Sequence, residues 1–494
     1  MLRNTISLLS RLSRLSRLSR LRAARHAGVL ALGTLAAAGA ALAQNYSPEL
    51  IEKGRYLATA SDCIACHTAS KAQPMAGGHA ISSPVGEIVA TNITPSKSHG
   101  IGNYSEQQFA DALRKGVRAD GARLYPAMPY TAFARFTNED VHALYAYFME
   151  GVAPVDAAPK ASTALPFPMN VRASMIGWNL LFADGKPFEP DPAQTPEWNR
   201  GAYLAQGAGH CATCHTPRGA LMQELASQSL SGAQIGAWWA PDITNSRTHG
   251  IGSWSVDDLT RYLATGHLPG KAQAAGPMAE AITHSFSRLH ESDLRAISRY
   301  ILSVSSHQPE DSAQRNRFGF GQATDATAGF RGTSFAEGMK QSGVALGAQV
   351  FTANCASCHG ASGQGTQDGY YPALFGKSIT GEANPSNLIA AILNGVDRET
   401  PQGGHVFMPP FGDQVNAMVP LKNEEVAAVS NFLLTSYGNP AVSVTADQVQ
   451  VIREGGAKSG LILLARIGMA LGAVVVLGLL VLLATKRRRA RLER

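Results

Sequence analysis

The residues best suited to chemistry in this chain are its six cysteines, because all of them fall into three short CxxCH motifs. This pattern is the attachment signal for c-type haem. Two thiols at that spacing can add to the two vinyl groups of one porphyrin, and the following histidine reaches the iron from the same side. The sequence therefore predicts three covalently bound haem c groups. The motifs are Cys63-Ile-Ala-Cys66-His67, Cys211-Ala-Thr-Cys214-His215 and Cys355-Ala-Ser-Cys358-His359.

Two other kinds of CxxC site fit this chain less well. A structural zinc site pairs two CxxC motifs at short range, whereas these motifs begin 148 and 144 residues apart and each has its own histidine. A thioredoxin-like redox pair needs neither the trailing histidine nor three copies. We therefore interpret all three motifs as haem sites, in a chain with no cysteine left over for a disulfide.

The sixth ligand of each iron decides between an electron carrier and a haem enzyme, because an enzyme such as a peroxidase needs an open position. Three of the twelve methionines, Met128, Met278 and Met408, follow their motif histidines by 61, 63 and 49 residues, in loops that contain proline. Proline stiffens such a loop around a weak thioether donor. We predict three low-spin irons and no catalytic residue. The predicted axial ligands are His67, His215, His359, Met128, Met278 and Met408.

Other methionines and histidines compete for this role. Met75, Met222 and Met418 break the shared placement, so we expect them to fill gaps in the core. His99 and His249 occupy matching loop positions. We expect them to form hydrogen bonds, with a bis-histidine iron as the alternative.

An internal repeat surrounds the motifs. Gly54-Arg-Tyr-Leu57 before the first motif recurs as Gly201-Ala-Tyr-Leu204 before the second, and Gly347 to Phe351 occupies this place in the third. The small glycine would let an opening helix cross a closing helix closely. Closing helices are indicated by apolar residues at helical spacing, and Thr137 with Asp140 is a plausible cap for the first. The closing apolar residues are Val141, Leu144, Phe148, Leu294, Ile297, Ile301, Val426, Val429 and Leu433.

The two ends of the chain predict export and a membrane anchor. Residues 1–43 carry seven arginines, no acidic residue and an apolar run ending in Ala-Leu-Ala, as a secretory signal peptide does. Residues 461–484 are apolar apart from Arg466 and long enough to span a bilayer. The basic tail, residues 486–494, would stay in the cytoplasm by the positive-inside rule. We therefore expect a single C-terminal span in the inner membrane and haem domains in the periplasm.

The net charge of +7 does not describe the exported body. Seven arginines belong to the signal peptide and a net charge of +5 to the tail, so the remainder carries −5. A mildly acidic body argues against binding of nucleic acid.

With these motifs in place, the chain resembles the trihaem cytochrome c subunits of bacterial alcohol, aldehyde, gluconate and sorbitol dehydrogenase complexes. The likeness runs from about Ser47 to Tyr437, and it is most specific at Thr91–Thr94 with Gly100–Gly102, at Tyr125–Tyr130 and at Thr216–Arg218. It implies electron transfer from a flavin or quinoprotein catalytic subunit to ubiquinone. His99 and His249 depart from the family's usual threonine, and the C-terminal span is not universal in the family.

The predicted fold is mainly α: three tandem cytochrome c domains at 48–155, 196–307 and 335–440, followed by the transmembrane helix. Residues 166–192 and 312–332 would join the domains, and we expect Val171–Phe182 to form a short helix packed between them. The predicted function is electron transfer from a periplasmic dehydrogenase to ubiquinone, not catalysis. The alternatives are delivery of electrons to a terminal oxidase and a haem peroxidase with one open iron.

Overall fold

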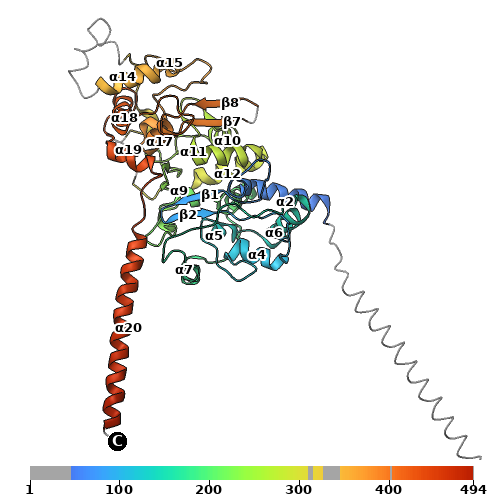
Figure 1. The fold of residues 1–494 in the computed structure, drawn as a ribbon. Helices are drawn as coiled ribbons and strands as arrows, with labels where there is room; N and C mark the ends of the chain where they lie inside the picture. Colours follow the sequence, from blue (N-terminus) through green and yellow to red (C-terminus); the bar gives the residue numbers. More distant parts are fainter. Residues whose placement is uncertain (1–45, 310–314, 326–344, 401–402, 493–494) are drawn as a thin grey trace, which may run out of the picture. The chain divides into compact units, whose positions relative to one another are not determined.

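The computed structural model describes residues 46–309, 315–325, 345–400 and 403–492 (Figure 1). The predicted signal peptide lies outside these residues, as do parts of the second linker. About 46% of the chain is helical, which confirms the mainly α prediction. Within the described part, the strands pair only as two-stranded antiparallel hairpins, so helices carry the architecture.

The first repeat unit begins with a helix that leads directly into the first CxxCH motif. The hydroxyl of Ser105 accepts from Gln108 N to start the helix α4, and Gly116, with φ 61°, ends it. The Thr137 hydroxyl accepts a hydrogen bond from Asp140 N, which confirms the predicted cap. The elements are α2 (Pro48–Ala60), α3 (Cys63–His67), β1 (Ala80–Ser83), β2 (Gly86–Val89), α4 (Glu106–Lys115), α5 (Tyr130–Phe133), α6 (Asn138–Ala146) and the π-helix η1 (Tyr147–Gly151).

The second unit repeats this order, including the local signals. Ser255 caps the helix α10 by accepting from Asp258 N, and Gly266, with φ 71°, ends it. The repeat seen in the sequence is therefore also a repeat of structure. The elements are α8 (Pro196–Gln206), α9 (Cys211–His215), η2 (Ala226–Gln228), β3 (Ala233–Ile235), β4 (Trp238–Ala240), α10 (Val256–Thr265), β5 (His267–Leu268), β6 (Ala272–Gln273), α11 (Gly276–His284), η3 (Phe286–Arg288) and α12 (Glu291–Ser303).

The third unit keeps the opening and closing helices but has an additional helix after them. This helix, α19, begins beyond residue 440 and buries Val449 and Ile452 in the core of the third unit. A short 3-10 helix, η4 (Arg317–Gly319), precedes the unit. The elements are α14 (Ala345–Asn354), α15 (Ala356–His359), α16 (Ser378–Gly381), α17 (Ser386–Asn394), β7 (Val396–Glu399), β8 (His405–Met408), α18 (Asn423–Tyr437), α19 (Ala446–Arg453) and α20 (Leu461–Leu492).

Each opening helix crosses the closing helix of its own unit at the predicted glycine. A Cβ atom on Gly54, Gly201 or Gly347 would overlap the backbone carbonyl of the facing helix. Only glycine permits this separation, so the prediction of a close crossing is confirmed. The facing residues are Ala143 in α6, Ala296 in α12 and Ala428 in α18. All nine apolar residues predicted for the closing helices are buried.

The first two units share one continuous hydrophobic core, whereas the third has its own. The shared core runs from Leu57 in α2 to Ile301 in α12. Aromatic rings cross the boundary: Tyr203 of the second unit lies 6.2 Å from Phe136 of the first, centroid to centroid. The second core runs from Ala348 to Ile452. The units are thus less independent than three separate domains would be.

The apolar segment between the first two units does not pack as predicted. A helix does form there, α7 (Ser174–Phe182), but none of its residues is buried. Leu180 is 86% exposed and Leu181 67% exposed. The predicted helix between the domains is present and contacts both, since Trp178 is bonded to Leu221 and Asn179 to Lys115. The expectation that its apolar side chains are packed is wrong, because apolar composition does not specify which surface covers a helix.

The helix α20 contains the predicted membrane span and continues through the described part of the basic tail to Leu492. Its 32 residues make it long and apolar enough to cross a membrane, and none of them is buried. Length and composition thus agree with the predicted anchor.

Candidate functional site

Each CxxCH motif forms a single helical turn directly after an opening helix. In the first two units, the preceding residue, Asp62 or His210, adopts a left-handed conformation, with φ 50° and 34°. This residue lies between the opening helix and the motif, and its left-handed conformation lets the new turn start in another direction. Because three residues span almost one turn, the two cysteines of a motif lie on one side of it. All six cysteines are partly exposed free thiols.

The motif histidines are oriented in the same way in all three units. In each, the ring Nδ1 lies within hydrogen-bonding distance of a backbone carbonyl: Thr91 O at 2.7 Å, Pro241 O at 2.7 Å and Pro372 O at 2.9 Å. A carbonyl only accepts, so Nδ1 carries the proton and the lone pair is on Nε2. The histidines are His67, His215 and His359, in that order.

This orientation fits haem iron as the group to be bound. Burial lowers the pKa of all three rings, so they are neutral at pH 7. A neutral imidazole with its second nitrogen bonded to a carbonyl is the form that ligates metals in proteins. The three Nε2 atoms therefore carry the lone pair that would bind the iron of a haem attached at the adjacent cysteines.

Four of the motif thiols are held in the protonated form in the chain without its cofactor. Burial raises the pKa of Cys63, Cys211 and Cys355 to about 12 and that of Cys66 to about 11. Thiols can add to the vinyl groups of a porphyrin, so a pair of free thiols at this spacing is compatible with thioether attachment.

The first two attachment sites lie close together. Glu280 and Cys214 of the second unit are near enough to Cys66 to contribute, after burial and Asp62, to its raised pKa. The helix α3 of the first unit contacts α11 of the second. Groups bound at these two motifs would therefore be close neighbours, which favours transfer of electrons between them.

The three predicted methionine ligands are all half-buried against a hydrophobic core. Met128 lies in the loop before α5, Met278 in the first turn of α11 and Met408 at the end of β8, opposite Val396. The prediction that all three lie in loops is confirmed for Met128 and wrong for the other two, because Met278 is in a helix and Met408 in a paired strand. Their role as iron ligands stays a prediction.

The residues that compete with the predicted axial ligands differ in their burial and in their contacts. Met75 is buried in the shared core, as predicted. Met418 is 72% exposed, so its predicted packing role is wrong. The backbone carbonyl of His249 accepts from Arg317 Nη1 at 2.7 Å, whereas the hydrogen bond expected of its side chain stays a prediction.

Arg317 is a residue that sequence reasoning missed. It belongs to η4 in the second linker, yet it is only 5% exposed. Besides the His249 carbonyl, its guanidinium contacts Asp242 O at 3.1 Å, directly after the carbonyl that orients His215. It therefore holds the loop that positions the second histidine. The only feature of the sequence that could have indicated the burial of Arg317 is its position directly before Phe318 in a polar stretch.

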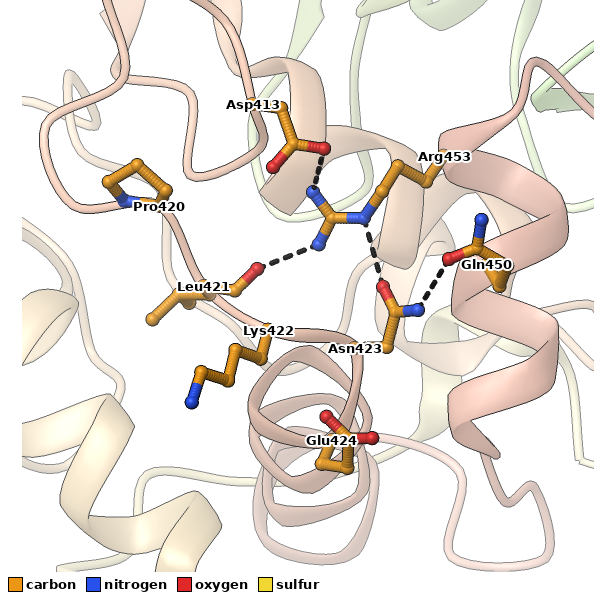
Figure 2. Close-up of a pocket in the computed structure, with 8 residues that line it drawn as sticks. All are labelled: Asp413, Pro420, Leu421, Lys422, Asn423, Glu424, Gln450 and Arg453. Carbon is orange, nitrogen blue, oxygen red and sulfur yellow. Dashed lines mark hydrogen bonds and ion pairs between the residues drawn. The ribbon is translucent and has the colours of Figure 1, made fainter.

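A surface cavity of about 360 Å³ lies on the third unit, away from the motifs (Figure 2). Figure 2 shows Arg453 at its centre, donating to Asp413 Oδ2 at 2.8 Å, Leu421 O at 2.7 Å and Asn423 Oδ1 at 2.9 Å. Asn423 in turn donates to Gln450. This network fastens α19 to the start of α18, so we interpret the cavity as structural.

The model of the cytochrome c family matches the chain three times, at residues 51–151, 199–305 and 344–436. The chain is 46% identical over 451 residues to the fructose dehydrogenase cytochrome subunit of Gluconobacter japonicus, covering 89% of this chain and 92% of the relative. It is 39% identical to the gluconate 2-dehydrogenase cytochrome c subunit of Pantoea cypripedii, covering 86% and 94%. It is 37% identical to the alcohol dehydrogenase (quinone) cytochrome c subunit of Gluconobacter oxydans, covering 86% and 87%.

Proposed function

The chain belongs to the cytochrome c family, among the cytochrome subunits of dehydrogenase complexes, and from this premise we propose that it carries electrons from a periplasmic catalytic subunit to ubiquinone in the inner membrane. Membership of this family by itself makes the chain an electron-transfer subunit that works with a dehydrogenase. What we propose beyond the family is the electron acceptor, the attachment to the membrane, the compartment and the number of haems.

We propose three haem c groups, one for each motif. Haem supplies an iron that accepts and releases one electron without leaving the protein. This chain's residues would fix each haem by two thioether bonds, present a neutral imidazole to the iron and close the opposite side with a methionine. The proposed attachment residues are Cys63, Cys66, Cys211, Cys214, Cys355 and Cys358, and the proposed axial ligands are His67, His215, His359, Met128, Met278 and Met408.

The observation that carries this proposal is the repeated orientation of the motif histidines. Three separate loops place a carbonyl 2.7–2.9 Å from Nδ1. The carbonyl also makes the ring more electron-rich and fixes its plane. A histidine that only filled space would not need the same partner type at the same nitrogen in every unit.

The donor and the acceptor are proposed from the relatives and from the ends of the chain. The relatives named above serve fructose, gluconate and alcohol dehydrogenases, and the last is named for a quinone. The predicted signal peptide and the basic tail support a periplasmic body with α20 as the anchor. A quinone is soluble in the bilayer, so an acceptor of this kind suits an anchored carrier.

The experiment uses the detergent-solubilised full chain purified with the catalytic subunit that accompanies it. Under anaerobic conditions, haem absorbance is followed while fructose, gluconate or ethanol is added, and then a soluble ubiquinone analogue. We expect one of these substrates to reduce the haems and the quinone to oxidise them again. Reduction without reoxidation by quinone would contradict the proposed acceptor, and a catalytic subunit that leaves the haems oxidised would contradict the proposed donor.

A further inference from the structure

An exposed apolar surface surrounds α7, and the proposed electron-transfer path does not use it. The large apolar side chains here are between 43% and 86% exposed. Single exposed apolar residues are ordinary, but a contiguous group marks a contact with another apolar phase or partner. We call this group the α7 patch; it consists of Phe167, Val171, Ile176, Leu180, Leu181 and Leu221.

The helix α7 is held firmly on its opposite face. Trp178 Nε1 donates to Leu221 O at 2.9 Å, and its ring lies edge-on to Tyr130. Asn179 accepts from the Tyr130 hydroxyl at 2.7 Å and donates to Lys115 O at 3.0 Å. These bonds fix the rotation of α7 about its axis. The exposed side chains of Ile176 and Leu180, one turn apart, are therefore held in a fixed direction.

The α7 patch is linked to the first turns of α20. Arg466 Nε in α20 donates to the carbonyl of Phe167 at 3.1 Å, and Ser459 N, just before α20, donates to Pro84 O at 2.9 Å. At a rise of roughly 1.5 Å per residue, Arg466 lies about 8 Å along α20 from Leu461. In a spanning helix, an arginine at this depth lies at the level of the lipid headgroups. Phe167 would then lie at that level too.

We propose that the α7 patch inserts into the periplasmic surface of the lipid bilayer beside α20. This inference rests on the proposed role of α20 as a membrane anchor. The patch combines an apolar outer face with an interfacial position, as surface-inserting helices do. Its occupant is lipid and not the catalytic subunit, because the Phe167 carbonyl is bonded to Arg466 of α20, and Leu463 and Leu464, less than a turn before Arg466, are exposed apolar residues of the anchor. With α7 inserted, the first two units are held against the membrane at a second point.

The test places a nitroxide spin label at Leu180→Cys in the full-length haem-loaded protein, reconstituted in vesicles of phosphatidylethanolamine and phosphatidylglycerol. Two matched labels serve as references: Val475→Cys in the middle of α20, and Val415→Cys, an exposed apolar position of the third unit. Protein without an added cysteine shows whether the haem cysteines take up label. Collisions with oxygen, which concentrates in lipid, are compared with collisions with a water-soluble nickel chelate.

We expect oxygen to relax the labels at residues 180 and 475 more than nickel does, and the reverse at residue 415. Nickel-accessible labels at both 180 and 415, with 475 in lipid, would overturn the α7 inference and leave the anchor intact. A water-exposed label at 475 would contradict the anchor itself, whatever residue 180 shows. If residue 180 becomes shielded from both reagents only when the catalytic subunit is added, that subunit is the occupant and the lipid assignment is wrong.

Discussion

The Tyr56 hydroxyl in α2 donates a 2.6 Å hydrogen bond to the Asp293 carboxylate in α12, across the boundary between the first two units. The bond has a counterpart in the opposite direction, because the Tyr203 hydroxyl in α8 donates to Asp140 in α6. Each tyrosine follows a crossing glycine by two residues. The duplicated units thus bind each other with duplicated residues, and this contact fixes the relation of the first two haem motifs.

Removal of one of these hydroxyls should weaken the joint core. Tyr56→Phe leaves the buried Asp293 carboxylate without one of its donors. We therefore expect a loss of about 1–3 kcal/mol in the free energy of unfolding. Urea unfolding of the haem-loaded protein, followed in the far ultraviolet, measures it. Tyr370→Phe, at an exposed tyrosine of the third unit, is the matched control. Equal stability of the two variants would show that the hydrogen bond does not hold the units together.

The ionisation of the Asp293 carboxylate should make the stability of the protein depend on pH. Burial acts to raise the pKa of Asp293, but hydrogen bonds from Arg200 and Tyr56 outweigh it and lower the pKa below its ordinary value. A lowered pKa in the folded state stabilises the fold above the unfolded pKa of about 3.9, and this stabilisation is lost as the pH falls through the lowered pKa. Asp293→Asn should therefore be less stable than wild type at neutral pH, and the gap should close in acid.

Urea unfolding at a series of pH values checks this. The control is Asp257→Asn, which removes an exposed ion pair with Arg295 and should have little effect. A gap that stays constant from neutral pH to acid would exclude the ionised Asp293 carboxylate as its cause.

Whether Met408 binds the third haem iron decides if that haem is an electron carrier or has an open position for catalysis. Since a methionine ligand raises the haem potential, Met408→His should lower the potential of one haem and leave the other two unchanged. Met408→Ala should open one iron to carbon monoxide. A redox titration and a carbon monoxide difference spectrum of the reduced protein measure both effects. Met418→Ala, at an exposed methionine ten residues on, should match wild type. Carbon monoxide binding by wild type would favour the open-site alternative.

The anchor can be tested by ending the chain after Gly460. The full-length protein should remain in the membrane after a high-salt wash and require detergent for extraction. The shortened protein should be recovered without detergent, because an apolar surface patch alone supports only weak and reversible binding. Haem absorbance in the membrane and soluble fractions reports both. A shortened protein that still needs detergent would mean that α20 is not the main anchor.

Local patterns in the sequence predicted the parts of the fold that depend on near neighbours. The cap of Thr137 on Asp140 N, the helix crossings at Gly54 and Gly201 and the buried closing helices all follow from short spacings. The CxxCH motifs likewise locate the candidate sites, because the chemistry of attachment is contained in five consecutive residues.

Relations between distant segments were not predictable in this way. Tyr56 and Asp293 are 237 residues apart, and neither residue type indicates its partner. Arg317 lies in a polar linker without periodicity, so nothing local indicates its burial. The helix α7 was predicted, but its exposure was not, because apolar side chains show only that a segment avoids water.

The number of haems in the mature protein tests the central claim most directly, since electron transfer through three units requires one haem in each. The measurement is the intact mass of the denatured protein, after acid–acetone extraction has removed any haem that is not covalently bound. The account predicts the mass of the mature chain plus three haem groups. A mass with one or two haem groups would contradict it, because at least one CxxCH motif would then have another role.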